Sequence, residues 1–314
     1  MSALAFALLA LCLVGPVPAA LARASWPLRA PRAALVLWQA IALAAVLSAF
    51  SAGIAIASRL FLRNDGPGGA LGLGEIHRMG WPVWSAYVVV FGLTCVVGVR
   101  FVVAVFRVAI ATRRRRAHHR LLVDILDVSR CSHGAARRGE LRILDVEQPL
   151  AYCLPGVRSR VVLSEGALTT LGTREVTAIL SHERAHLRAR HDLVLEAFTA
   201  VRAAFPRFVS SATALDAVRL LIELLADDAA VRTAGPTPLA RALVACASAH
   251  TPAGALAAGG PTTVLRVRRL AGQPNSRVYS VIAYLCAVTV LVVPTVALAV
   301  PWLTELQRLL STSH

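Results

Sequence analysis

Hydrophobic residues along this chain gather in four long runs separated by shorter polar segments. The runs lie at about residues 3–22, 33–60, 83–106 and 278–302. A helix of about 20 apolar residues is long enough to cross the roughly 30 Å hydrocarbon layer of a membrane, and apolar runs of this length do not fit inside a small soluble core. The pattern predicts a multi-span α-helical membrane protein with about four transmembrane helices.

The first run has a second interpretation, as a cleaved signal peptide. Ala20-Leu21-Ala22 offers the small residues that a signal peptidase requires. The segment before the run, however, contains no basic residue, whereas a secretory signal begins with a charged region. We therefore favour a transmembrane helix at this position.

Arginines at the ends of the runs predict the orientation in the membrane. Arg23, Arg29 and Arg32 follow the first run, and the block Arg113–Arg116 follows the third. Basic residues flanking membrane helices remain on the cytoplasmic side. We therefore expect a cell-membrane protein with both termini outside and a short external loop, rich in glycine, at about residues 63–80.

The segment between the third and fourth runs has the composition of a folded domain. We expect a membrane region at residues 1–112, an inserted cytoplasmic α+β domain at 113–277, and a fourth transmembrane helix with a short external tail at 278–314. About 165 residues are enough for an independent core. Candidate chemistry should therefore lie within the inserted domain.

Local patterns predict both strands and helices inside this domain. Residues 141–163 alternate between apolar and polar and contain the turn Leu154-Pro155-Gly156, which predicts two short strands. Residues 171–190 show helical spacing, with Thr173 as the expected N-cap and Glu175 in the first turn. A second helix is expected at about residues 214–232.

Composition and charge exclude several classes of protein. With 57% hydrophobic and 16% charged residues, the chain is too apolar for two soluble domains. Its net charge of +16 would suit a nucleic-acid binder, but many arginines, including Arg266, Arg268 and Arg269, lie beside apolar runs. We expect contact with membrane lipid and no direct contact with nucleic acid. The six scattered cysteines form no CxxC pair, so neither a disulfide framework nor a cysteine metal site is indicated.

The helix at residues 171–190 carries the motif HExxH, from His182 to His186. Residues four apart share one face of a helix, so the two imidazoles can bind a single zinc ion. Glu183 is then placed to take a proton from zinc-bound water. With this composition the motif is expected by chance only roughly 0.007 times in a chain of this length, so we interpret it as a catalytic zinc site.

A catalytic zinc site needs a third protein ligand, for which two solutions are common. A histidine six residues after the second one is absent, because Asp192 stands there, and His191 would point away from His182 on an ideal helix. The other solution is an acidic residue on a later helix, and Glu223 fits it. Asp227, one turn later, could accept the free N–H of a ligating histidine. Its alternative role is a solvated charge on the helix surface.

The two motifs together resemble a known family. HExxH, followed by Glu223-x-x-Ala226-Asp227 between the third and fourth spans, resembles the BlaR/MecR antirepressor family of membrane zinc metallopeptidases and is also similar to HtpX-like membrane proteases. The segment from Arg158 to Leu168 is similar to the strand and turn that precede the zinc helix in the antirepressor family. The resemblance implies a zincin-like domain that binds Zn²⁺ and cleaves a protein substrate.

The resemblance also implies a substrate, namely a cytoplasmic transcriptional repressor of the BlaI/MecI type that is cleaved in response to a signal. Antibiotic-sensing members carry an external penicillin-binding domain after the fourth span, whereas this sequence ends at His314. We therefore expect no sensing of β-lactams by that route.

Two other functions stay open. One is a quality-control protease like the HtpX group, and the other is a non-catalytic membrane receptor with a structural zinc site. A structural site usually has a fourth protein ligand, and the sequence shows no obvious candidate for it. Together with Glu183, this favours an enzyme.

Overall fold

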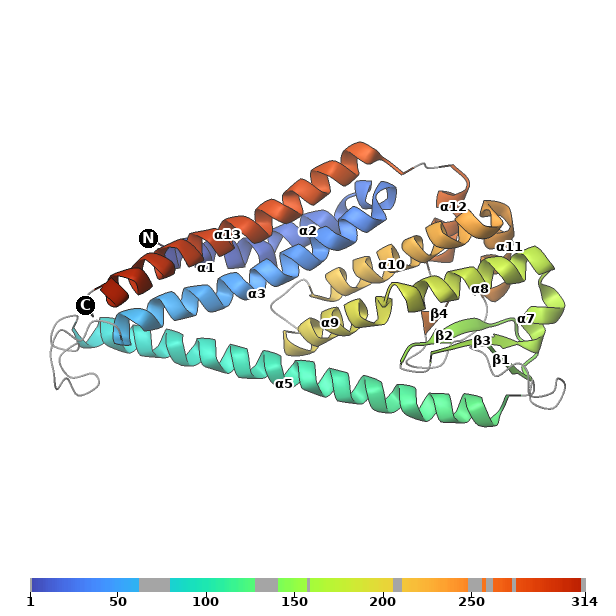
Figure 1. Ribbon diagram of the computed structural model, residues 1–314, viewed down its shortest axis with the longest axis horizontal. Coiled ribbons are helices and arrows are strands. Elements are labelled where there is room, and N and C mark those ends of the chain that lie inside the picture. Colours follow the sequence, from blue (N-terminus) through green and yellow to red (C-terminus); the bar gives the residue numbers. More distant parts are fainter. Residues whose placement is uncertain are drawn as a thin grey trace.

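A computed structural model shows an elongated, mostly helical molecule with a small sheet near one end (Figure 1). The structure describes residues 2–61, 80–127, 141–156, 159–205, 211–247, 256–257, 262–272 and 275–311. Nearly all of the predicted external loop, residues 62–79, lies outside these ranges, as does Cys131. The other five cysteines are free thiols.

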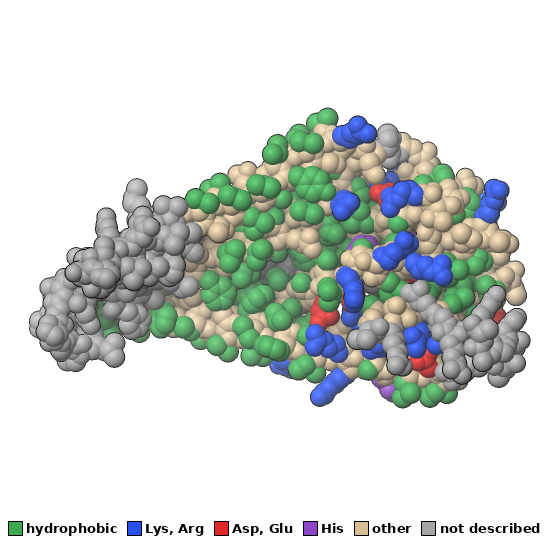
Figure 2. Space-filling model, in the orientation of Figure 1, with side chains coloured by type: hydrophobic (Ala, Val, Ile, Leu, Met, Phe, Trp, Pro, Cys, Tyr) green, Lys and Arg blue, Asp and Glu red, His purple; other side chains and the backbone are tan. Residues whose placement is uncertain are grey.

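Three helices among the described residues are long and apolar enough to cross a membrane. They are α3 (Pro31–Phe61), α5 (Trp81–Ile125) and α13 (Arg277–Ser311), of which the segments Pro31–Ser51, Trp81–Ile125 and Arg277–Val296 qualify. Hydrophobic side chains cover the surface of this elongated part, whereas arginines gather toward the end that carries the sheet (Figure 2). The chain is therefore a membrane protein.

The predicted first span is divided into two helices, α1 (Ser2–Val14) and α2 (Pro16–Arg23), with a break at Gly15. Pro16 has no N–H to continue the helical hydrogen bonds of α1, and its ring restricts the residue before it. Within the described residues, only a shorter apolar stretch, Leu8–Arg23, remains here. Three of the four predicted spans are thus present as single long helices, and the count of four is not confirmed.

Helix α5 continues well beyond the predicted third span and crosses the predicted domain boundary near residue 113. Its 45 residues make it about 68 Å long, roughly twice the thickness of the hydrocarbon layer. The second half of α5 runs beside α9 (His191–Ala204) and ends near the sheet (Figure 1). The block Arg113–Arg116 therefore lies within a continuous helix.

Among the described residues the sheet has four strands in the order β1-β3-β2-β4: β1 (Leu141–Leu144), β2 (Ala151–Leu154), β3 (Arg160–Ser164) and β4 (Leu256–Ala257). Strands β2 and β3 form the antiparallel pair expected around the predicted turn, whereas β1 pairs in parallel with β3. Residues 141–164 therefore contain three strands, one more than predicted. A parallel pair is not joined by a local turn, so the turn pattern gave no sign of β1.

Helices surround the sheet and contain both predicted helices of the inserted domain. They are α7 (Glu165–Thr170), α8 (Thr173–Arg188), α9, α10 (Ser211–Ala234), α11 (Pro236–Cys246) and α12 (Thr263–Leu270). The N-cap of α8 is Gly172, not Thr173 as predicted. The reason is that the Glu175 side chain reaches back three residues and accepts the Gly172 N–H at 3.0 Å.

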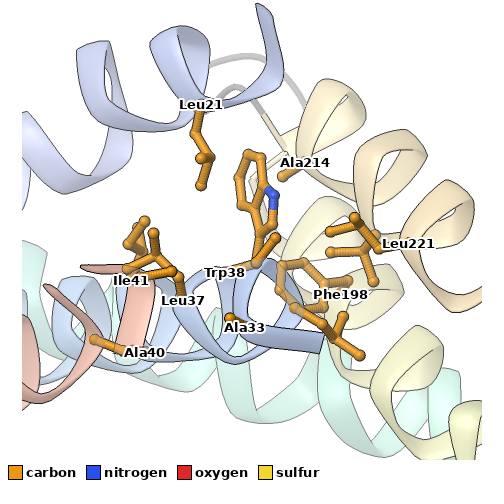
Figure 3. Packing of buried hydrophobic residues seen from close by; sticks show 14 of the residues in the cluster. Leu21, Ala33, Leu37, Trp38, Ala40, Ile41, Phe198, Ala214 and Leu221 are labelled. Carbon is orange, nitrogen blue, oxygen red and sulfur yellow. The ribbon is translucent and has the colours of Figure 1, made fainter. Parts of the chain in front are cut away.

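The largest buried cluster joins α3 and α13 to α9 and α10. Trp38 of α3 is only 2% exposed and lies among Leu21, Phe198, Ala214 and Leu221 (Figure 3). A second cluster packs α8 against the sheet and α11. Helices of the predicted inserted domain thus share a core with the predicted membrane region.

Candidate metal centre

The three predicted metal ligands converge between α8 and α10. One candidate ligand atom from each of His182, His186 and Glu223 lies within 4.8 Å of the other two. The Nε2 atoms of the two histidines are 3.1 Å apart, and the Glu223 oxygens lie 3.4 Å from His182 Nε2 and 3.6 Å from His186 Nε2. Two imidazole nitrogens and a carboxylate oxygen facing one point are a donor set that suits a divalent metal ion.

Asp227 lies directly behind the first of these histidines. It is 1% exposed, and its Oδ1 atom is 3.0 Å from Nδ1 of His182, on the side of the ring away from His186. Burial by itself would lower the pKa of His182, but the carboxylates of Asp227 and Glu223 raise it to about 9. The alternative role of Asp227 as a solvated surface charge does not agree with this burial.

Arg266 of α12 completes the site and was not predicted to be part of it. Its guanidinium makes two hydrogen bonds to Asp227, at 2.8 and 2.6 Å, and its Nη1 atom lies 2.9 Å from Oε2 of Glu223. The expectation that Arg266 flanks the membrane is therefore wrong, because the residue is only 1% exposed. Arg269, in the same segment, pairs with Asp228 at 2.7 Å.

From the sequence, only the helical phase of α12 could have shown that Arg266 is buried while the neighbouring Arg268 is exposed. Thr263 and Arg266, three residues apart, are buried on one face, whereas Val264, Leu265 and Arg268 are exposed. That phase can be assigned only when the start of the helix is known. The sequence has three arginines within four positions, and no residue marks where the helix begins.

Neighbouring histidines and Arg266 keep the two carboxylates of the site ionised. Burial opposes ionisation of Glu223, but His186, His182 and Arg266 together lower its pKa below the usual value. Burial likewise opposes ionisation of Asp227. The hydrogen bonds from Arg266 and the contact with His182 outweigh this effect and lower the pKa of Asp227 below its usual value. Both carboxylates are therefore available as anions at neutral pH.

Glu183 is completely buried beside the two histidines. Within the described part of the chain, neither of its carboxylate oxygens accepts a well-aligned hydrogen bond. Burial raises the pKa of Glu183 to about 7, although the nearby His182 opposes this change. A carboxyl group with a pKa near neutrality can both accept and release a proton at physiological pH. A site that holds a metal-bound water beside this carboxylate would also leave its oxygens without a hydrogen bond from the protein.

His191 lies behind the second histidine. Its Nδ1 atom is 3.0 Å from Nδ1 of His186, so it faces the outer nitrogen of that ring and not the point where the three ligand atoms converge. Burial lowers the pKa of His186 to about 3 and that of His191 to about 4. Both rings are therefore neutral at pH 7.

Comparison with known proteins gives a match to a family of peptidases. No curated protein and no solved structure matches the chain. The matched segment includes HExxH but ends before Glu223 and Asp227, so the place of these two residues in the site rests on the geometry above. Residues 75–205 match the family described as BlaR1 peptidase M56, which confirms the resemblance to membrane metallopeptidases of the BlaR/MecR type.

Proposed function

We propose that this protein is a membrane-embedded zinc endopeptidase in which His182, His186 and Glu223 bind the metal and Glu183 is the catalytic base. The observation that carries the proposal is the convergence of the three ligand atoms within 4.8 Å, next to a buried carboxyl group with a pKa near 7. The peptidase family match supports the reaction class. Zinc is the metal that most often takes two histidines and one glutamate in such enzymes.

When bound, zinc polarises the scissile carbonyl and lowers the pKa of its water to about 7. Glu183 takes a proton from the attacking water and passes it to the leaving amine. Its burial suits both steps, because the raised pKa makes Glu183 a stronger base towards water, while a pKa of about 7 still allows the proton to pass to the leaving amine. Asp227, with Oδ1 3.0 Å from Nδ1 of His182, is placed to take the Nδ1–H and so leave Nε2 for the metal.

For the substrate, we propose a cytoplasmic transcriptional repressor of the BlaI/MecI type. The support is the match to the BlaR1 peptidase family, together with the arginines of α5, which favour a cytoplasmic position for the site. A quality-control protease like the HtpX group is the second candidate, since it would use the same residues. A receptor with a structural zinc site is disfavoured, because only three candidate ligand side chains converge among the described residues, whereas a structural site usually has four.

The test compares the full-length wild type with Glu183→Gln in native membranes. Zinc content and cleavage of a co-expressed repressor are both measured. We expect the variant to keep zinc and to lose cleavage by at least about 100-fold, since a positioned general base contributes that much. Glu165→Gln, an exposed change just before the zinc helix, is the matched control and should behave as wild type.

The possible outcomes separate the candidates. Wild type that holds zinc, spares the repressor and degrades a misfolded membrane protein would favour the quality-control function. Equal cleavage by wild type and Glu183→Gln would remove Glu183 from the reaction. A wild type that binds no zinc would refute the proposed function as a whole.

A further inference from the structure

Helix α9 contains none of the proposed metal ligands, yet it connects the metal centre with α5. It begins directly after α8, and Arg190 makes the turn between them with a left-handed backbone conformation (φ 51°). Such a conformation is uncommon for a residue other than glycine and indicates that the turn is held by its surroundings. His191, the first residue of α9, is thereby brought against His186.

Metal binding would give the contact between His191 and His186 a hydrogen-bonding direction. A metal on Nε2 of neutral His186 would leave the hydrogen of this ring on Nδ1. Nδ1 of His191, 3.0 Å away, would then be the acceptor for this hydrogen. His191 therefore lies against the outer nitrogen of His186, as Asp227 lies against that of His182.

Two arginines of α5 hold the two ends of α9. At the start of α9, Nη1 of Arg116 donates to Oδ2 of Asp192 at 3.0 Å and lies 3.7 Å from Glu196. At the other end, Nε of Arg100 donates to the carbonyl oxygen of Ala204 at 2.6 Å. Helix α5 therefore contacts α9 through hydrogen bonds at both of its ends.

The ion pair at the start of α9 is largely buried. The side chains of Arg116 and Asp192 are 13% and 4% exposed, whereas the preceding arginines of the same block, Arg113–Arg115, are exposed. Arg116 thus differs from Arg113–Arg115 in that its side chain is covered by α9. Removing one partner from a buried pair leaves the other charge without compensation, so the pair resists separation.

We propose that His191 is a positioning residue for His186 and that Arg116, through Asp192, makes this positioning depend on the membrane helix α5. The proposal rests on the proposed function, because it requires His186 to be a metal ligand. Its consequence is regulatory: a displacement of α5 relative to α8 changes the hydrogen bond to His186 and with it the affinity for the metal.

The first experiment compares His191→Asn with His191→Leu in the full-length protein in detergent. The Asn side chain offers an acceptor oxygen near the position of Nδ1, whereas Leu fills a similar volume without an acceptor. The zinc affinity is measured by competition with a chromophoric chelator, and the ligand geometry by the visible spectrum of the Co²⁺-substituted protein. We expect Leu to weaken zinc binding about 10- to 100-fold and to shift the Co²⁺ spectrum, and Asn to restore most of both.

Equal losses for Asn and Leu, or no loss for either, would overturn the positioning role. A failure of the proposed function is distinguishable, since in that case the wild type itself would bind no zinc or would lose none of its activity in Glu183→Gln.

The second experiment tests the connection to α5. Arg116→Ala and Asp192→Asn should each weaken zinc binding about 10-fold, while Arg115→Ala, an exposed change in the same arginine block, should bind zinc as wild type does. Arg116→Ala added to His191→Leu should cause no further loss, because both changes break the same connection. Losses that add independently, or a loss in Arg115→Ala equal to that in Arg116→Ala, would refute the coupling.

Discussion

Arg266 contacts both carboxylates that lie between α10 and α12, so its removal should be costly. In Arg266→Leu, Asp227 loses two hydrogen bonds and Glu223 loses its nearest cation. Breaking a buried ion pair from one side costs about 3–5 kcal/mol. We expect a loss of this size in the free energy of unfolding of the metal-free protein, measured by denaturant titration in detergent.

Arg268→Leu is the control for this change, since Arg268 is exposed on the same short helix. Its free energy of unfolding should stay within about 0.5 kcal/mol of wild type. Saturating zinc should recover part of the loss in Arg266→Leu, because Glu223 gains the metal as a partner. Equal stabilities for the two variants would show that Arg266 does not hold the carboxylates.

The metal-site residues differ in how far the sequence alone could identify them. His182 and His186 are four residues apart on one helix, and Glu223 and Asp227 are four apart on another, so helical spacing was enough to group each pair. The structure then brings the two pairs together. Arg266 and the contact of His191 with His186 depend on how separate helices are placed, which no spacing rule supplies.

At the scale of elements, the turn from β3 into α7 is fixed by two small residues. Oγ of Ser164 accepts hydrogen bonds from the N–H groups of Ala167 and Leu150 and donates one to the carbonyl oxygen of Gln148. Gly166 lies so close to the preceding loop that an added Cβ would be 1.8 Å from the carbonyl oxygen of Glu147. This turn places the start of α8, and both residues belong to the segment that resembles the antirepressor family.

Gly166→Ala should therefore destabilise the protein. The loop at Glu147 must move to admit the methyl group, and overpacking of this kind costs about 1–3 kcal/mol. The midpoint of thermal unfolding in detergent would measure the loss. Gly92→Ala is the matched control, since an added Cβ there meets no atom within 4 Å, and it should leave the midpoint unchanged. A midpoint for Gly166→Ala equal to that of wild type would contradict the close approach.

Elements with strong local patterns were predicted, and those that depend on distant contacts were not. Helices α8 and α10 have clear helical spacing and lie where expected, and the hairpin of β2 and β3 follows a recognisable turn. Strand β1 contains the buried Arg142, which is held by Asp124 and Asp127 of another segment. Its burial and its parallel pairing could not be derived from four residues of sequence.

At the scale of the whole molecule, the membrane part and the part with the metal site form one packed unit. Phe198 of α9 and Leu215, Val218 and Ile222 of α10 are buried in the same cluster as Trp38 of α3. The sequence suggested a boundary at residue 113, because composition changes there. Composition does not show which apolar faces on either side cover one another.

This shared core predicts that residues 113–277 will not form a soluble monomer by themselves. Without α3 and α13, the apolar faces of α9 and α10 would be open to water, and large exposed apolar patches cause association or membrane binding. The fragment should therefore sediment or bind to lipid vesicles, whereas the full chain in detergent should elute as a defined species. A monomeric fragment that is soluble and binds zinc would contradict the prediction, because the metal centre would then be independent of the helices that connect it to the membrane.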